Sequence, residues 1–481
     1  MELNVGLLSP EILLTGIAVF MILLDLITPK RFKNKLFSVI SSVAVGVAII
    51  LTLSKISPIP QKAFNGFITK EAFTGIIDIL VLFSGLFTVL VSHDFIERKK
   101  ISYIGEFYYT LLFVLVGAML LAGSSELSTL FVSLEVASIS TYILMSLFKG
   151  DYRGKEGALK YFITGSVGAA LLVYGMAVLY GLTGTTLYGE IAQAAEKLSP
   201  LPLLLAAGLI AAGFLFKTGA VPFHGWMPDA YEGAPTPVTL LMGSAVKVAA
   251  FAAFIKLFIP IFYHFQAEWE KALGVIAVIS MFSGALLALN QRNVKRMLAY
   301  SAISHTGIII ATFLSSPALT VFSVVFYLFA YTFMTVAAFG LITILSANGI
   351  KGEEIESWKG LYSKNPLLSL SAVAIFMSLA GIPPLVGFWG KFYILLALVK
   401  SGEVLLAVSV LIASLISLYF YLKPVVYIFM KEGTGEKFIP GAGEYVATIV
   451  STAAIVIFGL LPEVIAQISI MGLSSFLRSL T

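Results

Sequence analysis

Residues 217–247, KTGAVPFHGWMPDAYEGAPTPVTLLMGSAVK, carry a lysine at each end and cannot form one continuous helix. Lys217 closes the apolar run LLLAAGLIAAGFLF, and a second apolar run begins at Pro237 and carries Lys247 near its middle. Between the runs stand four helix-breaking residues: Gly219, Pro222, Gly225 and Pro228. Pro lacks the amide donor and Gly adds backbone entropy, so we expect the helix to be interrupted here. A broken helix beside buried charge is typical of ion and proton pathways in membranes.

The composition of the rest of the chain places this segment in a membrane. Of the 481 residues, 59% are hydrophobic and only 12% are charged, far from the balance of a soluble domain. The sequence lacks strong strand alternation and hairpin signals, which argues against an outer-membrane barrel. It therefore predicts an all-α polytopic membrane protein.

The side chains that commonly hold metals and redox groups are scarce. The chain has no Cys and four His, namely His93, His224, His264 and His305. No two His share a helix at the spacing of ligands, so we expect no metal site, no haem and no iron–sulfur cluster. We expect no cofactor and no redox centre in this chain.

Fourteen segments are long and apolar enough to span a bilayer, which requires about 20 residues each. They are 10–28, 36–54, 73–92, 106–123, 126–148, 158–181, 201–221, 237–259, 271–290, 295–314, 318–346, 366–400 (interrupted), 403–430 and 442–465. The seventh and twelfth contain Gly/Pro breaks and are predicted to be discontinuous. The outward segment 183–200 is predicted to hold a short amphipathic helix on the surface.

The loops give the orientation. Twenty Lys and Arg residues fall in the loops on one side and seven in those on the other, so both termini should face outward. The net charge of +5 is thus a topology signal, and we expect the lipid bilayer and no nucleic acid as a partner. The start MELNVGLLSPE lacks a basic region, and KRFKNK follows the first apolar stretch, so this stretch is read as a spanning helix and not as a cleaved signal.

Five ionisable residues lie deep inside predicted spans: Glu135, Lys217, Lys247, His305 and Lys391. A charge at the middle of the bilayer costs about 2.5–3.5 kcal/mol on insertion scales, so these residues should face the bundle interior. Each lysine could also be a structural pin, and His305 a structural histidine. His224 adjoins the break and is either a relay residue or a cap. Five charges near span ends are interpreted as interface or packing residues: Asp25, Asp78, Glu126, Lys256 and Lys423.

Spacing predicts an internal repeat. Glu135 and His305 are 170 residues apart, and Lys217 and Lys391 are 174 apart. In each half of the chain, an uninterrupted span with a central polar group precedes a broken span with a lysine. Matching broken spans in two halves are typical of repeated transporter units. We expect an N-terminal three-helix segment (1–105), a five-helix repeat (106–259), an inverted second repeat (271–430) and a C-terminal helix (431–481).

Three stretches resemble the antiporter-like subunits of respiratory complex I, the NADH–quinone oxidoreductase. They are VPFHGWMPDAYEGAPTPVT, RNVKRMLAYSAISHTG and LAGIPPLVGFWGKFYIL. The YEGAPTPVT form and the lysine of the twelfth span resemble subunit N, the mitochondrial subunit 2 type. The C-terminal region, without a long lateral helix after the last span, also differs from the L type. The resemblance covers essentially the whole chain.

The resemblance implies proton translocation in a bacterial inner membrane, within a hetero-oligomer with other membrane-arm subunits and powered by quinone reduction elsewhere. It assigns relay positions to Glu135, Lys217, Lys247, His305 and Lys391. In our hypothesis Lys217 holds the proton and Glu135 sets its proton affinity. Lys247 and His305 then pass the proton along a hydrated axis to Lys391.

Three alternatives stay open. A subunit of a multisubunit cation/proton antiporter or of a membrane-bound hydrogenase shares most of the pattern. A purely structural membrane subunit would use the same charges for assembly. A quinone-binding role is also open, since the aromatic content (37 Phe and 20 Tyr) suits quinone or lipid equally well.

Overall fold

The fold is known from a computed structural model, which describes residues 3–99, 101, 103–147, 152–346, 352–433 and 440–480. Four of the twenty basic loop residues that predict the orientation lie outside these ranges: Lys100, Lys149, Lys351 and Lys437.

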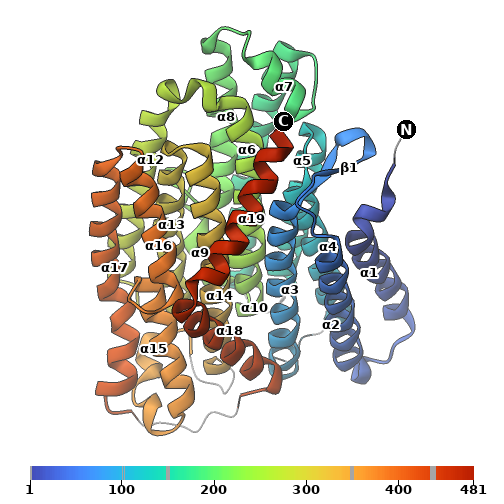
Figure 1. Ribbon diagram of the computed structural model, residues 1–481. Coiled ribbons are helices and arrows are strands. Elements are labelled where there is room, and N and C mark those ends of the chain that lie inside the picture. The colour runs from blue at the N-terminus through green and yellow to red at the C-terminus, as the bar shows by residue number, and fades with distance from the viewer. Residues whose placement is uncertain are drawn as a thin grey trace.

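The chain forms a bundle of helices that runs from α1 and α2 at one edge to α12 and α17 at the other (Figure 1). The first half contains α1 (Ser9–Ile27), α2 (Lys30–Lys55), α3 (Ala72–Lys99), α4 (Ile104–Gly123), α5 (Leu127–Ser146), α6 (Tyr152–Thr183), α7 (Tyr188–Ala195), α8 (Pro200–Thr218), α9 (Trp226–Gly233) and α10 (Thr236–Leu241). The second half contains α11 (Lys247–Phe262), α12 (Gln266–Leu289), α13 (Val294–Ala311), α14 (Pro317–Leu345), α15 (Pro366–Ala380), α16 (Val386–Lys400), α17 (Val404–Met430), α18 (Ala442–Leu460) and α19 (Pro462–Leu480).

Twelve helices of the described part are long and apolar enough to cross a membrane, which confirms a polytopic helical membrane protein. The count differs from the predicted fourteen for two reasons. The continuous helical stretch Thr236–Leu289 has 54 residues and is counted once, although it covers two predicted spans. The helices α15 and α16 have 15 residues each, too short to qualify singly.

The centre of the bundle is α14, whose most apolar window is completely buried. It packs against α10, α15, α16, α18, α19 and α3. Its sequence is hydrophobic around the whole circumference, as expected of a helix with no lipid-facing side. By contrast, α1 and α2 lie at the edge (Figure 1) and expose large apolar side chains, which suits contact with lipid.

Two elements were missed by the sequence analysis. A two-stranded antiparallel sheet, β1 (Gln61–Ala63) and β2 (Ile68–Lys70), precedes α3 in this otherwise helical fold. The strands have three residues each, too short for a visible alternation. The second is α19, which follows α18 closely and crosses the bundle obliquely (Figure 1). The short helix expected within 183–200 is confirmed as α7, which buries one face through Tyr188, Ile191 and Ala195.

Two helices end inside the bundle by the same hydrogen-bond pattern. α8 ends at Thr218, where Gly219 takes a φ of 77° and Ala220 N donates to Leu215 O at 2.8 Å. α15 ends at Ala380, where Gly381 takes a φ of 90° and Ile382 N donates to Met377 O at 3.0 Å. A left-handed residue followed by a bond back to the last turn is a helix C-cap that favours glycine. In both places the glycine of the sequence sets where the helix stops.

Candidate functional site

Lys217 lies in the last turn of α8, and its side chain is buried. Its Nζ donates to Ser138 Oγ at 2.6 Å and to Tyr161 OH at 2.9 Å. The ring of Tyr161 stacks on Trp226 with centroids 4.0 Å apart, which fixes the hydroxyl in place. The ammonium is thus held by two neutral oxygen atoms from α5 and α6.

Glu135 is half-buried on α5, one turn before Ser138. It shares with Lys217 a cavity of about 10 Å³ that Tyr142 also lines, about the room that one water molecule needs. Among the described residues no direct ion pair joins Glu135 to Lys217. Their charges do interact across the cavity. The structure therefore brings this predicted pair together, with space for water between the two groups.

Lys247 begins α11 directly after a π-helical turn, η3 (Met242–Val246). Single π-turns inside α-helices are rare and occur frequently at functional sites. The Nζ of Lys247 donates to the backbone oxygen of Ala302 at 2.6 Å and lies 5.3 Å from the centre of the Tyr331 ring. The widened turn was not predicted, because nothing in the apolar sequence TLLMGSAV distinguishes a π-turn from an α-helix.

His305 is buried on α13, one turn beyond Ala302. Its Nδ1 shares a hydrogen bond of 2.5 Å with Tyr327 OH, and its Nε2 shares one of 2.9 Å with Tyr421 OH. The Tyr331 ring lies edge-on to the imidazole, 5.4 Å between centroids. Tyr331 thus touches both Lys247 and His305.

Lys391 lies on α16 and is buried against the broken end of α15. Its Nζ donates to Leu379 O at 3.1 Å and to Ala380 O at 2.9 Å. The last carbonyl groups of a helix have no partner within the helix and carry partial negative charge, so they bind cations. His305 lies within electrostatic range of both Lys391 and Lys247.

His224 stands apart from these five residues. It lies in the loop between α8 and α9, half-buried, where its carbonyl accepts from Met227 N at 3.0 Å. No hydrogen bond or ion pair of the described residues joins it to the other predicted site residues. Gly225, and not His224, is the N-cap residue of α9, so the described contacts give His224 the position of a loop residue.

The sequence did not predict a role for the buried tyrosines that lie near the two groups of site residues. Tyr231 lies within electrostatic range of Tyr161, which binds Lys217, and of Tyr331, which touches Lys247. All three side chains are buried. A buried tyrosine hydroxyl needs a polar neighbour, and this requirement is a signal that the sequence analysis set aside when it assigned the aromatic residues to lipid or quinone contact.

A second connection runs through the backbone. Thr306 Oγ1, next to His305, donates to the carbonyl of Thr218, next to Lys217, at 2.8 Å. That carbonyl belongs to Thr218, the last residue of α8, and the last carbonyls of a helix have no acceptor role within it. The two helices that carry Lys217 and His305 are therefore joined at the level of these residues.

Of the span-end charges, Asp78 and Lys256 are packing residues and not interface residues. Each is almost fully buried, in ion pairs with Lys70 and Glu71 respectively. The sequence places them near span ends, but the β1–β2 hairpin covers that end and excludes solvent. Glu126 is also buried and caps α5, while Asp25 pairs with Lys33 at 2.7 Å and Lys423 donates to Gln291 O at 3.1 Å.

Comparison with known proteins gives the family. A profile described as "NADH:quinone oxidoreductase/Mrp antiporter, TM" matches residues 124–417. The chain is 36% identical over 472 residues to "NADH-quinone oxidoreductase subunit N" of Trichlorobacter lovleyi, covering 97% of this chain and 96% of that protein. It is 38% identical over 450 residues to "NADH-quinone oxidoreductase subunit N 2" of Rhizobium meliloti, covering 92% of each.

Chains in solved structures of membrane complexes superpose on this chain over nearly its whole length. A chain of "Respiratory complex I from Thermus thermophilus with bound Aureothin" superposes with a TM-score of 0.82 at 30% identity, covering 95% of this chain and 99% of that one. A chain of the archaeal membrane-bound sulfane sulfur reductase superposes with a TM-score of 0.88 at 24% identity, covering 98% of this chain and 97% of that one. The latter likeness shows a shared fold.

Proposed function

Because the chain belongs to the subunit N family of NADH–quinone oxidoreductase, we propose that it carries protons through the membrane arm of that complex along its buried lysines, His305 and the intervening tyrosines. It is a multi-pass protein of the bacterial inner membrane and works with the other membrane-arm subunits. Electron transfer takes place elsewhere in the complex, and this chain functions without a cofactor of its own.

The observation that carries the proposal is the kind of partner that each lysine has. Among the described residues, no carboxylate lies within ion-pair distance of the Nζ of Lys217, Lys247 or Lys391, which bind hydroxyl and carbonyl oxygens instead. Other buried lysines of the chain, such as Lys70 and Lys256, have carboxylates. A lysine with neutral partners leaves no unpaired buried carboxylate behind when it gives up its proton. Lys217, Lys247 and Lys391 can therefore lose and regain a proton without the free-energy cost of an unpaired buried carboxylate.

The order of the groups gives the path. Glu135 and the water-sized cavity lie at one end, beside Lys217. Tyr161, Tyr231 and Tyr331 lead from Lys217 to Lys247. His305 follows and faces Lys391, whose carbonyl partners at the end of α15 form the far end of the path. Water between these groups completes the steps that their side chains cannot bridge.

The two broken helices support the predicted repeat. The ends of α8 and α15 share a positive-φ glycine and the same hydrogen bond to the preceding turn, and each break lies beside a buried lysine. We place these breaks at corresponding positions of two five-helix repeats, 106–259 and 271–430. With five spans each, the repeats have opposite orientations, and both termini face outward.

The test replaces Lys217 by Ala in the assembled complex, reconstituted in vesicles. We expect proton transport per electron to fall, while the subunit content of the complex stays normal. Lys423→Ala is the matched control, since Lys423 lies near the end of α17 and binds only Gln291 O in the described part. Wild-type transport in Lys217→Ala contradicts the assignment. Loss of assembly in that variant, with normal transport by the complexes that do form, supports the purely structural alternative.

A further inference from the structure

A second group of buried charges lies outside the path, at the end of the bundle that carries both termini (Figure 1). It consists of Glu11 of α1, Lys70 of β2, Glu71, Asp78 of α3 and Lys256 of α11. Each carboxylate residue of the group is only 2% exposed, so these charges are shielded from bulk water. Nothing in the proposed path uses them.

The pairing within this group is unequal. Lys70 Nζ lies 2.5 Å from Glu11 Oε1 and 2.6 Å from Asp78 Oδ2, so one ammonium serves two carboxylates. Lys256 Nζ lies 3.4 Å from Glu71 Oε1. With every group ionised, the three carboxylates exceed the two lysines by one negative charge. An uncompensated buried charge is costly, and a bound proton removes it.

The structure also leaves places where a proton can bind. Glu11 Oε2 and Asp78 Oδ1 are buried and accept no hydrogen bond from the described residues. Buried carboxylate oxygens normally have a hydrogen-bond partner. Two such oxygens without one, on carboxylates that share a single lysine, indicate that one of the two carboxylates carries a proton. Glu71 Oε2 is a third free oxygen, but its carboxylate has Lys256 to itself.

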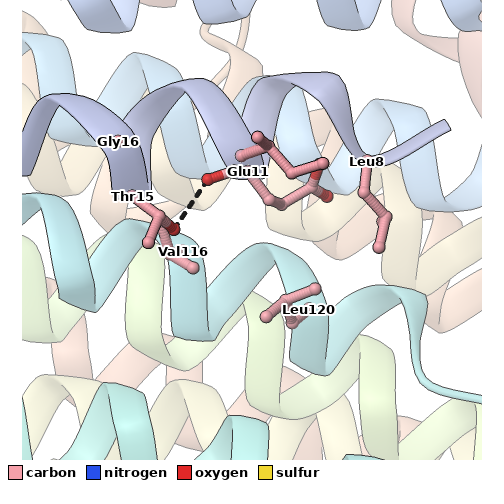
Figure 2. Close-up of a pocket in the computed structure, with 7 residues that line it drawn as sticks. Leu8, Glu11, Thr15, Gly16, Val116 and Leu120 are labelled. Carbon is pink, nitrogen blue, oxygen red and sulfur yellow. Dashed lines mark hydrogen bonds between the residues drawn. The ribbon is translucent and has the colours of Figure 1, made fainter. Parts of the chain in front are cut away.

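Two cavities reach the group. One has a volume of about 20 Å³, which is enough for one water molecule. It is lined by Lys70, Glu71 and Asp78 and extends to Lys55. Lys55 is half-exposed and is held by Gly6 O and Ser9 Oγ, with no carboxylate within ion-pair distance in the described part. The other is a groove of about 380 Å³ between α1 and α4, and Glu11 lies on its wall with Thr15 and Leu120 (Figure 2).

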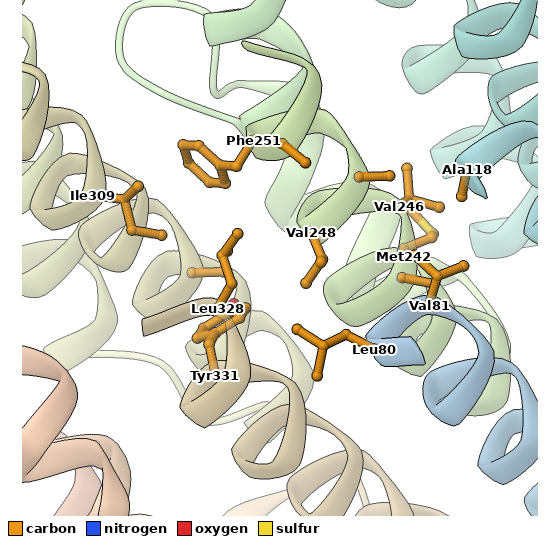
Figure 3. Packing of buried hydrophobic residues seen from close by; sticks show 14 of the residues in the cluster. Leu80, Val81, Ala118, Met242, Val246, Val248, Phe251, Ile309, Leu328 and Tyr331 are labelled. Carbon is orange, nitrogen blue, oxygen red and sulfur yellow. The ribbon is translucent and has the colours of Figure 1, made fainter. Parts of the chain in front are cut away.

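The group is separate from the path. Lys256 and Lys247 are nine residues apart on α11, about two and a half turns, and so point to opposite sides of the helix. On the side of α3, Leu80 and Val81 pack among Met242, Val246 and Val248 (Figure 3). These five side chains are apolar, so none of them can pass a proton between the two places.

We propose that Glu11, Lys70 and Asp78 form a proton-binding site that exchanges one proton with the water on the side of the membrane where both termini lie. A hydronium ion reaching the cavity at Lys55 gives its proton to the free oxygen of Asp78, which lines that cavity. One O–H bond of the hydronium breaks, one carboxyl O–H bond forms, and a neutral water remains. Lys70 keeps its proton and pairs with whichever carboxylate stays ionised.

The test is infrared difference spectroscopy of the whole complex, followed through the carbonyl stretch of a protonated carboxyl group. Two difference spectra are recorded at neutral pH by subtracting the spectrum of Glu11→Gln or of Asp78→Asn from that of the wild type. Both should show the same carboxyl band. Either substitution leaves one carboxylate for Lys70 and so removes the bound proton. Asp25→Asn is the matched control, because Asp25 has Lys33 as its own partner and should leave the band in place. Absence of the band in both difference spectra overturns the proposal.

A measurement on the wild-type complex remains decisive if the variants fail to assemble. Replacing H₂O by D₂O should shift a protonated carboxyl band that rises and falls with pH. If no such band shifts in D₂O, the exchange proposal fails. It also fails if added sodium removes the band at constant pH. The experiment does not measure pumping, so its failure leaves the translocation path intact. Conversely, Lys217→Ala should leave this band unchanged.

Discussion

The Nζ atom of Lys391 lies 2.9 Å from the carbonyl oxygen of Ala380, the last residue of α15. The carbonyl is available because the helix stops there, and in a continuous helix it would accept an amide four residues later. The break and the lysine are thus two parts of one arrangement. The carbonyl groups at the end of α15 hold the Lys391 ammonium inside the membrane. Among the described residues, no carboxylate lies within ion-pair distance of it.

Gly381→Ala should disturb this arrangement directly. A Cβ at residue 381 would lie 2.8 Å from Cδ of Lys391, so the side chain of Lys391 must move away from its carbonyl partners. Gly402→Ala is the control: Gly402 also has a positive φ, 83°, but a Cβ there meets nothing within 4 Å. Both variants carry a backbone cost of about 1–2 kcal/mol. Only Gly381→Ala should reduce proton transport per electron in reconstituted complex, and equal reductions in both would argue against a role for the Lys391 contact.

Tyr231→Phe should slow proton transport without harming assembly. The substitution removes a hydroxyl that lies within electrostatic range of both Tyr161 and Tyr331 and keeps the buried ring. Tyr108→Phe is the matched control, since it also removes a buried hydroxyl, one that donates to Asn34 Oδ1 at 2.8 Å outside the path. Tyr108→Phe should cost about 1 kcal/mol of stability for its lost hydrogen bond. Transport at the wild-type rate in Tyr231→Phe would show that protons bypass this tyrosine.

Glu126 makes the start of α5, the helix of Glu135, sensitive to acid. Burial tends to raise the pKa of Glu126, but hydrogen bonds from Ser128 N at 2.9 Å and Thr129 N at 2.6 Å more than offset it, so the pKa lies below its ordinary value. A depressed carboxyl pKa stabilises the fold above the unfolded pKa, and that stability is lost as the pH falls through the folded pKa.

Hydrogen exchange measured by mass spectrometry should therefore show the first turn of α5 losing protection on acidification. In Glu126→Gln the protection should be lower at neutral pH and nearly independent of pH, at a cost of about 1 kcal/mol. Glu106→Gln, in the first turn of α4, is the control and should not change the exchange of α5. An unaltered acid response in Glu126→Gln would refute this role.

Ser475→Ala should loosen α19 from the bundle. Ser475 Oγ accepts a hydrogen bond of 2.9 Å from Phe73 N in the first turn of α3, where the amide has no partner within the helix. Removal of the hydroxyl leaves that buried amide unsatisfied, at a cost of about 1–3 kcal/mol. Ser474→Ala, whose hydroxyl binds only the neighbouring Met471 O, should cost less. Thermal unfolding of the purified chain in detergent measures both, and equal midpoints would contradict the prediction.

Local chemistry in the sequence determined much of this protein. The apolar content decided that the chain spans a membrane, and the glycines at 219 and 381 decided where two helices stop, because both effects act within a few residues. The rarity of charge inside apolar runs likewise singled out Glu135, Lys217, Lys247, His305 and Lys391. Four of these are buried, and Glu135 is half-buried beside Lys217.

Contacts between distant segments were decided only by the tertiary structure. The sequence does not reveal that Tyr231 lies within electrostatic range of Tyr161 and Tyr331, or that Glu11 and Asp78 share Lys70. The three-residue strands of the β1–β2 hairpin and the π-turn before Lys247 were equally invisible. In each case the partners are supplied by other helices or by packing, so the geometry follows from how the bundle assembles and not from the preference of any one segment.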